Sequence, residues 1–154
     1  MLPAQQSRDR QKALAGDDEY TQRFSTNLNA KAMQIGALLD LNLDARANQV
    51  VNALLKQSPN SPLGHFYHGV LLARAKDFNG AWAQMQLLSP GFIQSQAATA
   101  ASIAAGSGHG KIAGAILTTY VASNPADQLA RLQLAATWMG EKDPTAAVDA
   151  IPPS

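Results

Sequence analysis

Small and apolar residues recur along the chain with a period of about 34 residues. Each of three blocks holds a glycine or alanine followed twelve positions later by an alanine, and these pairs are Gly69 and Ala81, Ala101 and Ala113, and Ala135 and Ala147. Larger apolar side chains stand three or four positions after a small one, as Leu72, Met85 and Leu117 do. Such spacings place side chains on one face of a helix. The pattern therefore predicts pairs of antiparallel helices that cross where the small residues allow close approach.

Two prolines set the boundaries of the blocks. Pro59 in LKQSPNSP and Pro125 in VASNPADQ both follow a predicted helix, and proline is common just after a helix end. Taking each proline as position 32 of its block gives four blocks, which are 29–61, 62–93, 94–127 and 128–154, the last of them truncated. In the first block Gly36 pairs with Ala47 if its turn is one residue short. In the second block we expect Ser89-Pro90-Gly91 to cut off the second helix.

This arrangement resembles the tetratricopeptide-repeat family, whose 34-residue pattern has small residues at positions 8 and 20 and a proline at position 32. The resemblance covers residues 29–151. It implies an all-α fold, a right-handed superhelical solenoid of antiparallel helix pairs. Residues 1–28 do not repeat the pattern clearly, and we expect an N-terminal helical cap or a degenerate repeat there. Two short helices are predicted in this segment, with Asp17 as the N-cap of the second.

The composition supports helices and disfavours several kinds of site. Alanine, the best helix former, accounts for 29 of 154 residues. The formal net charge is only +1, so a nucleic-acid partner is not predicted, since nucleic-acid binders carry a clustered basic surplus. Without cysteine the chain has neither a disulfide framework nor a thiolate metal site. No signal peptide or membrane-spanning stretch stands out, so direct membrane insertion is not expected.

The stretch GSGHGKI, residues 106–112, looks like part of a phosphate-binding loop. Such a loop requires glycine at position 105 and Ser or Thr at position 112, where this chain has Ala105 and Ile112. In the repeat register these glycines fall between two helices, where a left-handed residue ends the first helix. We therefore predict a turn, with His109 near the start of the second helix. An unspecific anion at that helix N-terminus is left open.

Residues with catalytic or metal-binding chemistry are sparse. His65 and His68 are three positions apart on one side of a predicted helix, but no third ligand accompanies them. No Ser-His-Asp order is supported by local context, and no paired carboxylates stand at matched spacing. The sequence therefore predicts a non-enzymatic protein without metal or cofactor.

The family resemblance also implies a groove for a protein or peptide partner, lined by positions 2, 5, 9 and 12 of each first helix. On this sequence these positions are Leu63, Phe66, Val70, Ala73, Ser95, Ala98, Ser102, Ala105, Leu129, Leu132, Ala136 and Met139, with Lys31, Met33, Ala37 and Asp40 in the first block. The groove so defined is apolar and nearly neutral. Because it lacks the Lys, Arg and Asn clamp of the chaperone-binding members, a co-chaperone role is not expected.

Charged residues are nearly missing from the middle of the chain. Lys111 is the one charged side chain among the 49 residues from Phe78 to Ala126, whereas about a quarter of a solvated surface is charged. Coverage by a partner or by neighbouring repeats accounts for this, as does solvation by Gln, Ser, Thr and Asn. We therefore predict a scaffold that holds an extended or helical peptide. The alternative is a structural segment of a longer solenoid that forms homo-oligomers through its repeat ends.

A looser resemblance concerns the order of segments. The pieces SPLGHFYHGVLLARAKDFNGA and EKDPTAAVDAI are similar to the repeat region of bacterial lipoproteins of the PEP-CTERM/exosortase exopolysaccharide systems. This resemblance implies a periplasmic or outer-membrane-associated scaffold, with the cytoplasm as the alternative location.

Overall fold

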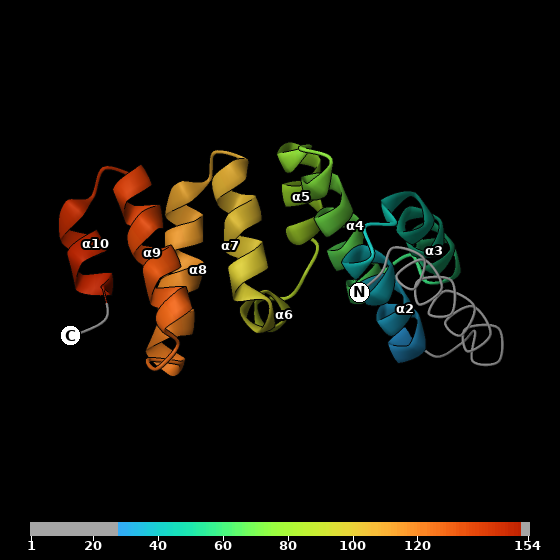
Figure 1. The fold of residues 1–154 in the computed structure, drawn as a ribbon, viewed down its shortest axis with the longest axis horizontal. Coiled ribbons are helices and arrows are strands. Elements are labelled where there is room, and N and C mark those ends of the chain that lie inside the picture. Colours follow the sequence, from blue (N-terminus) through green and yellow to red (C-terminus); the bar gives the residue numbers. More distant parts are fainter. Residues whose placement is uncertain (1–27, 152–154) are drawn as a thin grey trace, which may run out of the picture. The chain divides into compact units, whose positions relative to one another are not determined.

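The computed structural model describes residues 28–151 as a succession of helices (Figure 1). Within that range it contains no β-strand, and the predicted all-α class is confirmed. The helices predicted before residue 28, with Asp17 as an N-cap, lie outside the described residues. The helices are α2 (Leu28–Asp40), α3 (Asp44–Gln57), α4 (Pro62–Arg74), α5 (Phe78–Met85), α6 (Pro90–Ser95), α7 (Ala97–Gly106), α8 (Gly110–Ser123), α9 (Gln128–Gly140) and α10 (Pro144–Ala150).

The chain divides into two compact units, one ending at Leu71 and the other beginning at Leu72. The first unit is held together by an apolar cluster on α2, α3 and α4. Its fully buried members on α3 are one turn apart, as expected for one face of a helix. The buried residues of the cluster are Ile35, Leu38, Ala47, Val51, Leu54 and Leu71.

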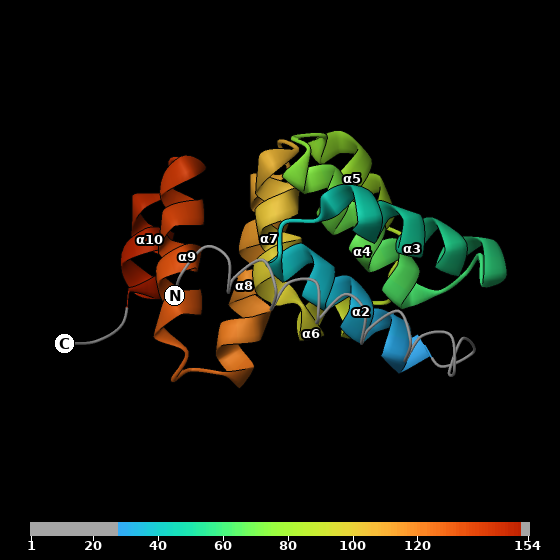
Figure 2. The same ribbon diagram turned by 45° about the vertical axis from the view of Figure 1, so that its right-hand side comes forward.

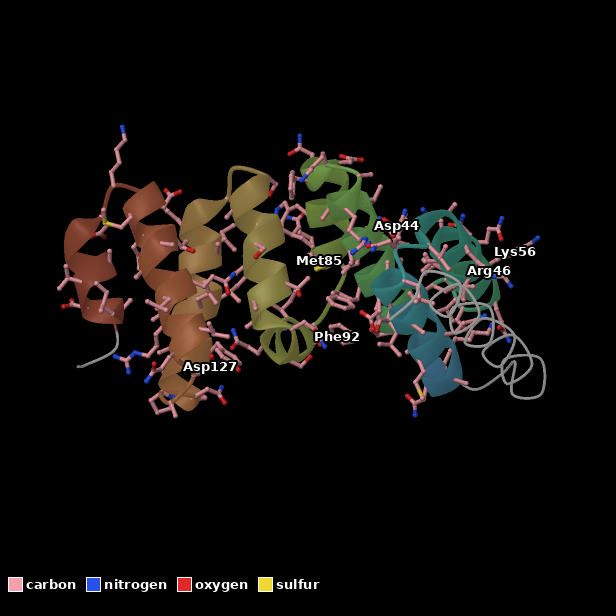
Figure 3. All side chains as sticks on the ribbon, viewed as in Figure 1. Asp44, Arg46, Lys56, Met85, Phe92 and Asp127 are labelled. Carbon is pink, nitrogen blue, oxygen red and sulfur yellow. The ribbon has the colours of Figure 1, made fainter. Side chains whose placement is uncertain are left out.

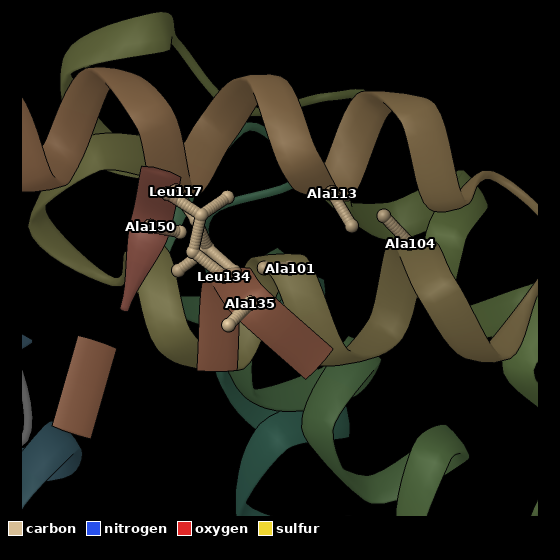
Figure 4. Close-up of a cluster of buried hydrophobic side chains, with 7 residues drawn as sticks. All are labelled: Ala101, Ala104, Ala113, Leu117, Leu134, Ala135 and Ala150. Atoms are coloured by element: carbon tan, nitrogen blue, oxygen red, sulfur yellow. The ribbon is translucent and has the colours of Figure 1, made fainter. Parts of the chain in front are cut away.

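In the second unit α7 packs against α8, α8 against α9, and α9 against α10, while α5 packs on α7. Figures 1 and 2 both show α7, α8, α9 and α10 side by side. The core of this unit is rich in alanine, so the helix backbones approach closely around two leucines (Figure 4). Its buried residues are Ala101, Ala104, Ala113, Leu117, Leu134, Ala135 and Ala150.

One type of turn closes every first helix of a pair. A residue with positive φ ends the helix, and the residue after it donates its N–H to the carbonyl five positions earlier, at 2.8 or 2.9 Å. This is the Schellman motif. The accepting carbonyls belong to Leu38, Leu72, Ala104 and Trp138, which are 34, 32 and 34 residues apart. The left-handed residues are Asn42, Lys76, Gly108 and Lys142.

These turns correct the expected register of the first block. The turn between α2 and α3 has the same form as the others, so it is not one residue short. The common spacing then places Ile35, rather than Gly36, at the position of Gly69 and Ala101. Ile35 is fully buried, whereas a methyl group added at Gly36 would meet nothing within 4 Å. Gly36 is therefore not the small residue of a helix crossing.

Helix α6 is an element that the sequence did not predict. The second helix of its block, α5, ends at Met85 and has 8 residues, against 14 in α3 and α8. Ser89 then caps α6 by accepting a hydrogen bond from the N–H of Phe92 at 3.2 Å. The side chain of Gln94 on α6 donates to the carbonyl of Ile116 on α8 at 3.1 Å. This short helix therefore packs beside α8 where α5 has already ended.

Candidate functional site

A groove lies along one side of the second unit, with α7 and α9 as its walls and α8 beneath them. Two hollows make up this groove, of about 490 and 290 Å³. Gly110, at the start of α8, lines the larger hollow, and Tyr120, near the end of α8, lines the smaller one. The groove therefore follows the length of α8.

Six of the eight predicted groove residues of the third and fourth blocks line the two hollows, whereas Leu132 and Met139 lie on α9 outside them. On the α7 side they are small and exposed: Ser95, Ala98, Ser102 and Ala105. On the α9 side they are mostly large, and Leu129, Leu132 and Met139 are 81%, 52% and 60% exposed. Together with the exposed Ala136, these three residues form what we call the α9 stripe. An unshielded row of large apolar side chains is typical of an interaction surface.

The side chain of Gln133 bridges the groove, and the sequence reasoning missed it. Its Nε2 donates to the carbonyl of Ala98 at 3.0 Å and to Oγ of Ser102 at 3.1 Å, both on α7. Gln133 lines both hollows and so stands between them. Position 6 of the fourth block is not among the groove positions of the family pattern, so only the pairing of α9 with α7 identifies this residue.

Each hollow contains one carboxylate and no basic side chain among its lining residues. Glu141 lines the larger hollow and Asp127 the smaller one. Figure 3 places Asp127 at the start of α9, where its Oδ1 accepts from the N–H of Ala130 at 3.0 Å. Its Oδ2 accepts from the hydroxyl of Tyr120 at 2.8 Å. These two bonds, the backbone bond first, lower the pKa of Asp127.

The predicted groove residues on α4 differ from those on α7 and α9. Phe66 is only 6% exposed, and its ring meets that of Tyr67 edge-on at 5.2 Å between centroids. It is therefore a buried packing residue and not a free contact for a partner. Leu63, Val70 and Ala73 are half-buried.

Lys31, assigned to the groove in the first block, is also buried. Only 7% of it is exposed, and its Nζ donates to the side chain of Gln57 at 2.6 Å. Lys31 is therefore a buried residue of α2 and not an exposed groove residue. Met33, by contrast, is 70% exposed.

The glycine-rich stretch forms the turn between α7 and α8, as predicted. Gly108 has a φ of 85°, and His109 occupies the N-cap position of α8. Oγ of Ser107 lies 2.9 Å from Nδ1 of His109, whose ring stacks on Trp82 with the ring centroids 5.2 Å apart. The glycines therefore serve the helix end, and His109 packs on α5.

A third hollow, of about 450 Å³, lies between α5, α6 and α8. Apolar side chains dominate its lining, among them Trp82, Leu88, Ile93 and Ile112. No charged side chain lines it among the described residues.

His65 of α4 has a structural role in the turn before its helix. Nε2 of His65 lies 2.9 Å from the carbonyl of Pro59, in the turn that precedes the helix.

Among residues 28–151 the structure contains no cluster of three side chains able to hold a metal ion. Over the same residues, every helix is too short or too polar to cross a lipid bilayer.

Comparisons with known proteins identify the fold. No protein-family model matches the chain, and no curated protein matches it in sequence. The solved structure of MamA from Desulfovibrio magneticus RS-1 is similar with a TM-score of 0.74 at 16% identity, covering 92% of this chain and 81% of that chain. A further crystal structure of MamA has a TM-score of 0.71 at 12% identity, covering 97% of this chain and 91% of that chain.

A third similar structure is a tetratricopeptide repeat protein from Parabacteroides merdae ATCC 43184. Its TM-score is 0.66 at 13% identity, and the match covers 95% of this chain and 58% of that chain. Taken with the recurring helix pairs and turns, these similarities show that the chain has a tetratricopeptide-repeat-type fold.

Proposed function

We propose that this repeat fold serves as a non-enzymatic protein-interaction scaffold, and that the groove between α7 and α9 holds a segment of its partner. The observation that carries the proposal is the α9 stripe, Leu129, Leu132, Ala136 and Met139, which is exposed on α9 and borders the groove through Leu129 and Ala136. Burying exposed apolar area of this kind is favourable by about 25 cal/mol per Å². A partner that covers the stripe supplies that burial.

The test is a pull-down from the envelope and soluble fractions of the source cells. Leu132→Glu places a carboxylate in the middle of the stripe at a side chain that is half exposed, so the fold tolerates it while the apolar surface that borders the groove is interrupted. We expect this variant to lose the partner and to keep the circular dichroism of the unaltered chain. Phe66→Glu is unsuitable because Phe66 is buried.

A matched control comes from the same unit. Leu87→Glu makes the same chemical change at a side chain that is 61% exposed, lies outside the α9 stripe and lines none of the three hollows. This variant is expected to keep the partner. If Leu132→Glu kept it as well, the α9 stripe would not be part of the binding site.

Self-assembly is the second candidate function, and the exposed face of α10 favours it. Val148 is 65% exposed and Ile151, just after the helix, is 50% exposed. A second copy of the chain that packs on this face would shield both side chains. The groove and this face are separate surfaces, so the two functions are compatible.

The proposed location is the bacterial envelope, in the periplasm or at the outer membrane. The proposal rests on the sequence resemblance to repeat lipoproteins of exosortase systems and on the 49 residues with Lys111 as their one charge. Fractionation of source cells with an antibody against the chain tests it. Recovery only with the cytosol would contradict the location and leave the scaffold proposal intact.

A further inference from the structure

The spacing of the residues in the α9 stripe favours a helical partner. Its members are separated by three, four and three residues, which is the spacing of a helix-packing seam. At 1.5 Å per residue the stripe extends about 15 Å along α9. Side chains in such a row can pack against the side chains of a second helix that lies alongside α9.

The opposite wall complements the stripe in size. Ala98, Ser102 and Ala105 are separated by four and three residues and are exposed on α7. Small side chains let the backbone of a second helix come close, as they do between helices within this unit. A partner helix can therefore lie against α7 and direct its apolar side chains toward α9.

The backbone of the groove argues against an extended partner. An extended segment gains much of its affinity by adding hydrogen bonds to an unpaired strand edge. Both walls here are helices, whose interior N–H and C=O groups already bond within the helix, and the carbonyl of Ala98 also accepts from Gln133. A helix satisfies its own backbone, so it enters such a groove without leaving polar groups unpaired.

The two carboxylates of the groove favour a partner helix with basic residues near its ends. Asp127 and Glu141 flank α9 at its two ends and line the two hollows. They are separated by 14 residues, or roughly 21 Å along the helix. Each oxygen of Asp127 already accepts one hydrogen bond and keeps a lone pair for another donor. No basic side chain of the groove lining neutralises either carboxylate.

We infer that the groove binds an amphipathic helix of a partner protein, about four turns long, with an apolar face and a lysine or arginine near each end. The inference rests on the proposed function, since it names the partner of that same groove. The distance between the two carboxylates gives the length of the partner helix. The α9 stripe accounts for its apolar face, and Asp127 and Glu141 account for its basic ends.

Selection from a phage-displayed library of random peptides, sixteen residues long, tests the inference without a known partner. The immobilised chain is the target, and phage that also bind the Leu132→Glu variant are removed in each round. We expect the surviving peptides to carry apolar residues three and four positions apart and to have Lys or Arg near both ends.

The enriched peptides are then synthesised with a fluorescent label, and their affinities are measured by anisotropy. We expect Asp127→Asn and Glu141→Gln each to weaken binding by at least threefold. Leu87→Glu should leave the affinity unchanged. A proline in the middle of the peptide should abolish binding, because it breaks the bound helix.

The outcomes separate the two proposals. If no peptide survives the Leu132→Glu counter-selection, the α9 stripe does not bind peptides and the proposed function, which rests on that stripe, itself fails. If the surviving peptides have alternating apolar residues, tolerate the proline or have acidic ends, the groove binds a partner but this inference is wrong. Unchanged affinity in both carboxylate variants would likewise overturn the role of the basic ends.

Discussion

At the scale of single residues, Asp127 combines three roles. It caps α9 through the N–H of Ala130, accepts a hydrogen bond from Tyr120 near the end of α8, and supplies one carboxylate of the groove. All of these roles favour the ionised form. The pKa of Asp127 is accordingly lowered from its ordinary value of 3.8.

This lowered pKa predicts how the Asp127→Asn variant depends on pH. An ionised group with a lowered pKa stabilises the folded state above the unfolded pKa of 3.8 and loses that contribution as the pH falls through the folded pKa. Urea unfolding from neutral to acid pH should therefore show the variant less stable at pH 7. The free energies of unfolding of the variant and of the unaltered chain should approach each other below pH 3.8.

Asp149→Asn is the matched control, since Asp149 is an exposed carboxylate on the neighbouring helix α10. It should unfold like the unaltered chain at every pH. A difference between Asp127→Asn and the unaltered chain that stays constant with pH would assign the effect to cap geometry and not to charge.

At the scale of elements, the contact between α8 and α9 depends on one glycine. The ring of Trp138 on α9 covers Gly114 on α8 so closely that an added Cβ would lie 2.5 Å from Cζ2 of the ring. Real Cβ atoms do not come this near, so any larger residue must displace the tryptophan. Trp138 also borders the core of the second unit.

Gly114→Ala should therefore lower the free energy of unfolding by about 1–3 kcal/mol, as overpacking does. Urea unfolding followed by tryptophan fluorescence measures it, because Trp82 and Trp138 are the two tryptophans of the chain and both lie in the second unit. Gly140→Ala is the control. A methyl group there meets nothing within 4 Å, so this change should leave stability equal or raise it by up to ~1 kcal/mol. Equal behaviour of the two variants would contradict the close contact.

The helices of each repeat could be predicted because their signals are local. The small residues Ala81, Ala101 and Ala113 are all buried, at 0–1% exposure, as the 34-residue pattern indicated. The register of the first block was wrong because Gly36 is small, whereas the crossing position holds Ile35. Composition alone cannot tell a glycine that permits close packing from one that faces open space.

The exposure of the proposed groove residues could be predicted only where a single helical face determines it. The exposed residues of α7 and α9 followed from the repeat register, because each wall is a single helical face. Phe66 was misassigned because an apolar residue at a groove position can equally be buried. The bridge made by Gln133 and the pairing of Asp127 with Tyr120 depend on contacts between helices, which periodicity does not encode.

At the scale of the whole molecule, the exposed face of α10 predicts self-association. Multi-angle light scattering should show the average mass rising with protein concentration as Val148 and Ile151 become covered. Val148→Glu should reduce this rise, because a carboxylate at the contact remains unpaired. Leu87→Glu makes the same kind of change at an exposed apolar side chain that is remote in sequence. It should leave the rise in mass unchanged. A constant monomer mass of the unaltered chain at high concentration would contradict self-assembly.

The Gln133 side chain stands where the two hollows of the groove meet, so the shape of the groove depends on it. A single neutral side chain, held by two hydrogen bonds, separates the two hollows. Its replacement by a short side chain would merge them into one continuous trough, while the helices and their core residues stay as they are. One substitution at Gln133 would thus change the shape of the groove without touching the buried residues that hold the fold. The shape of this surface can therefore change independently of the architecture beneath it.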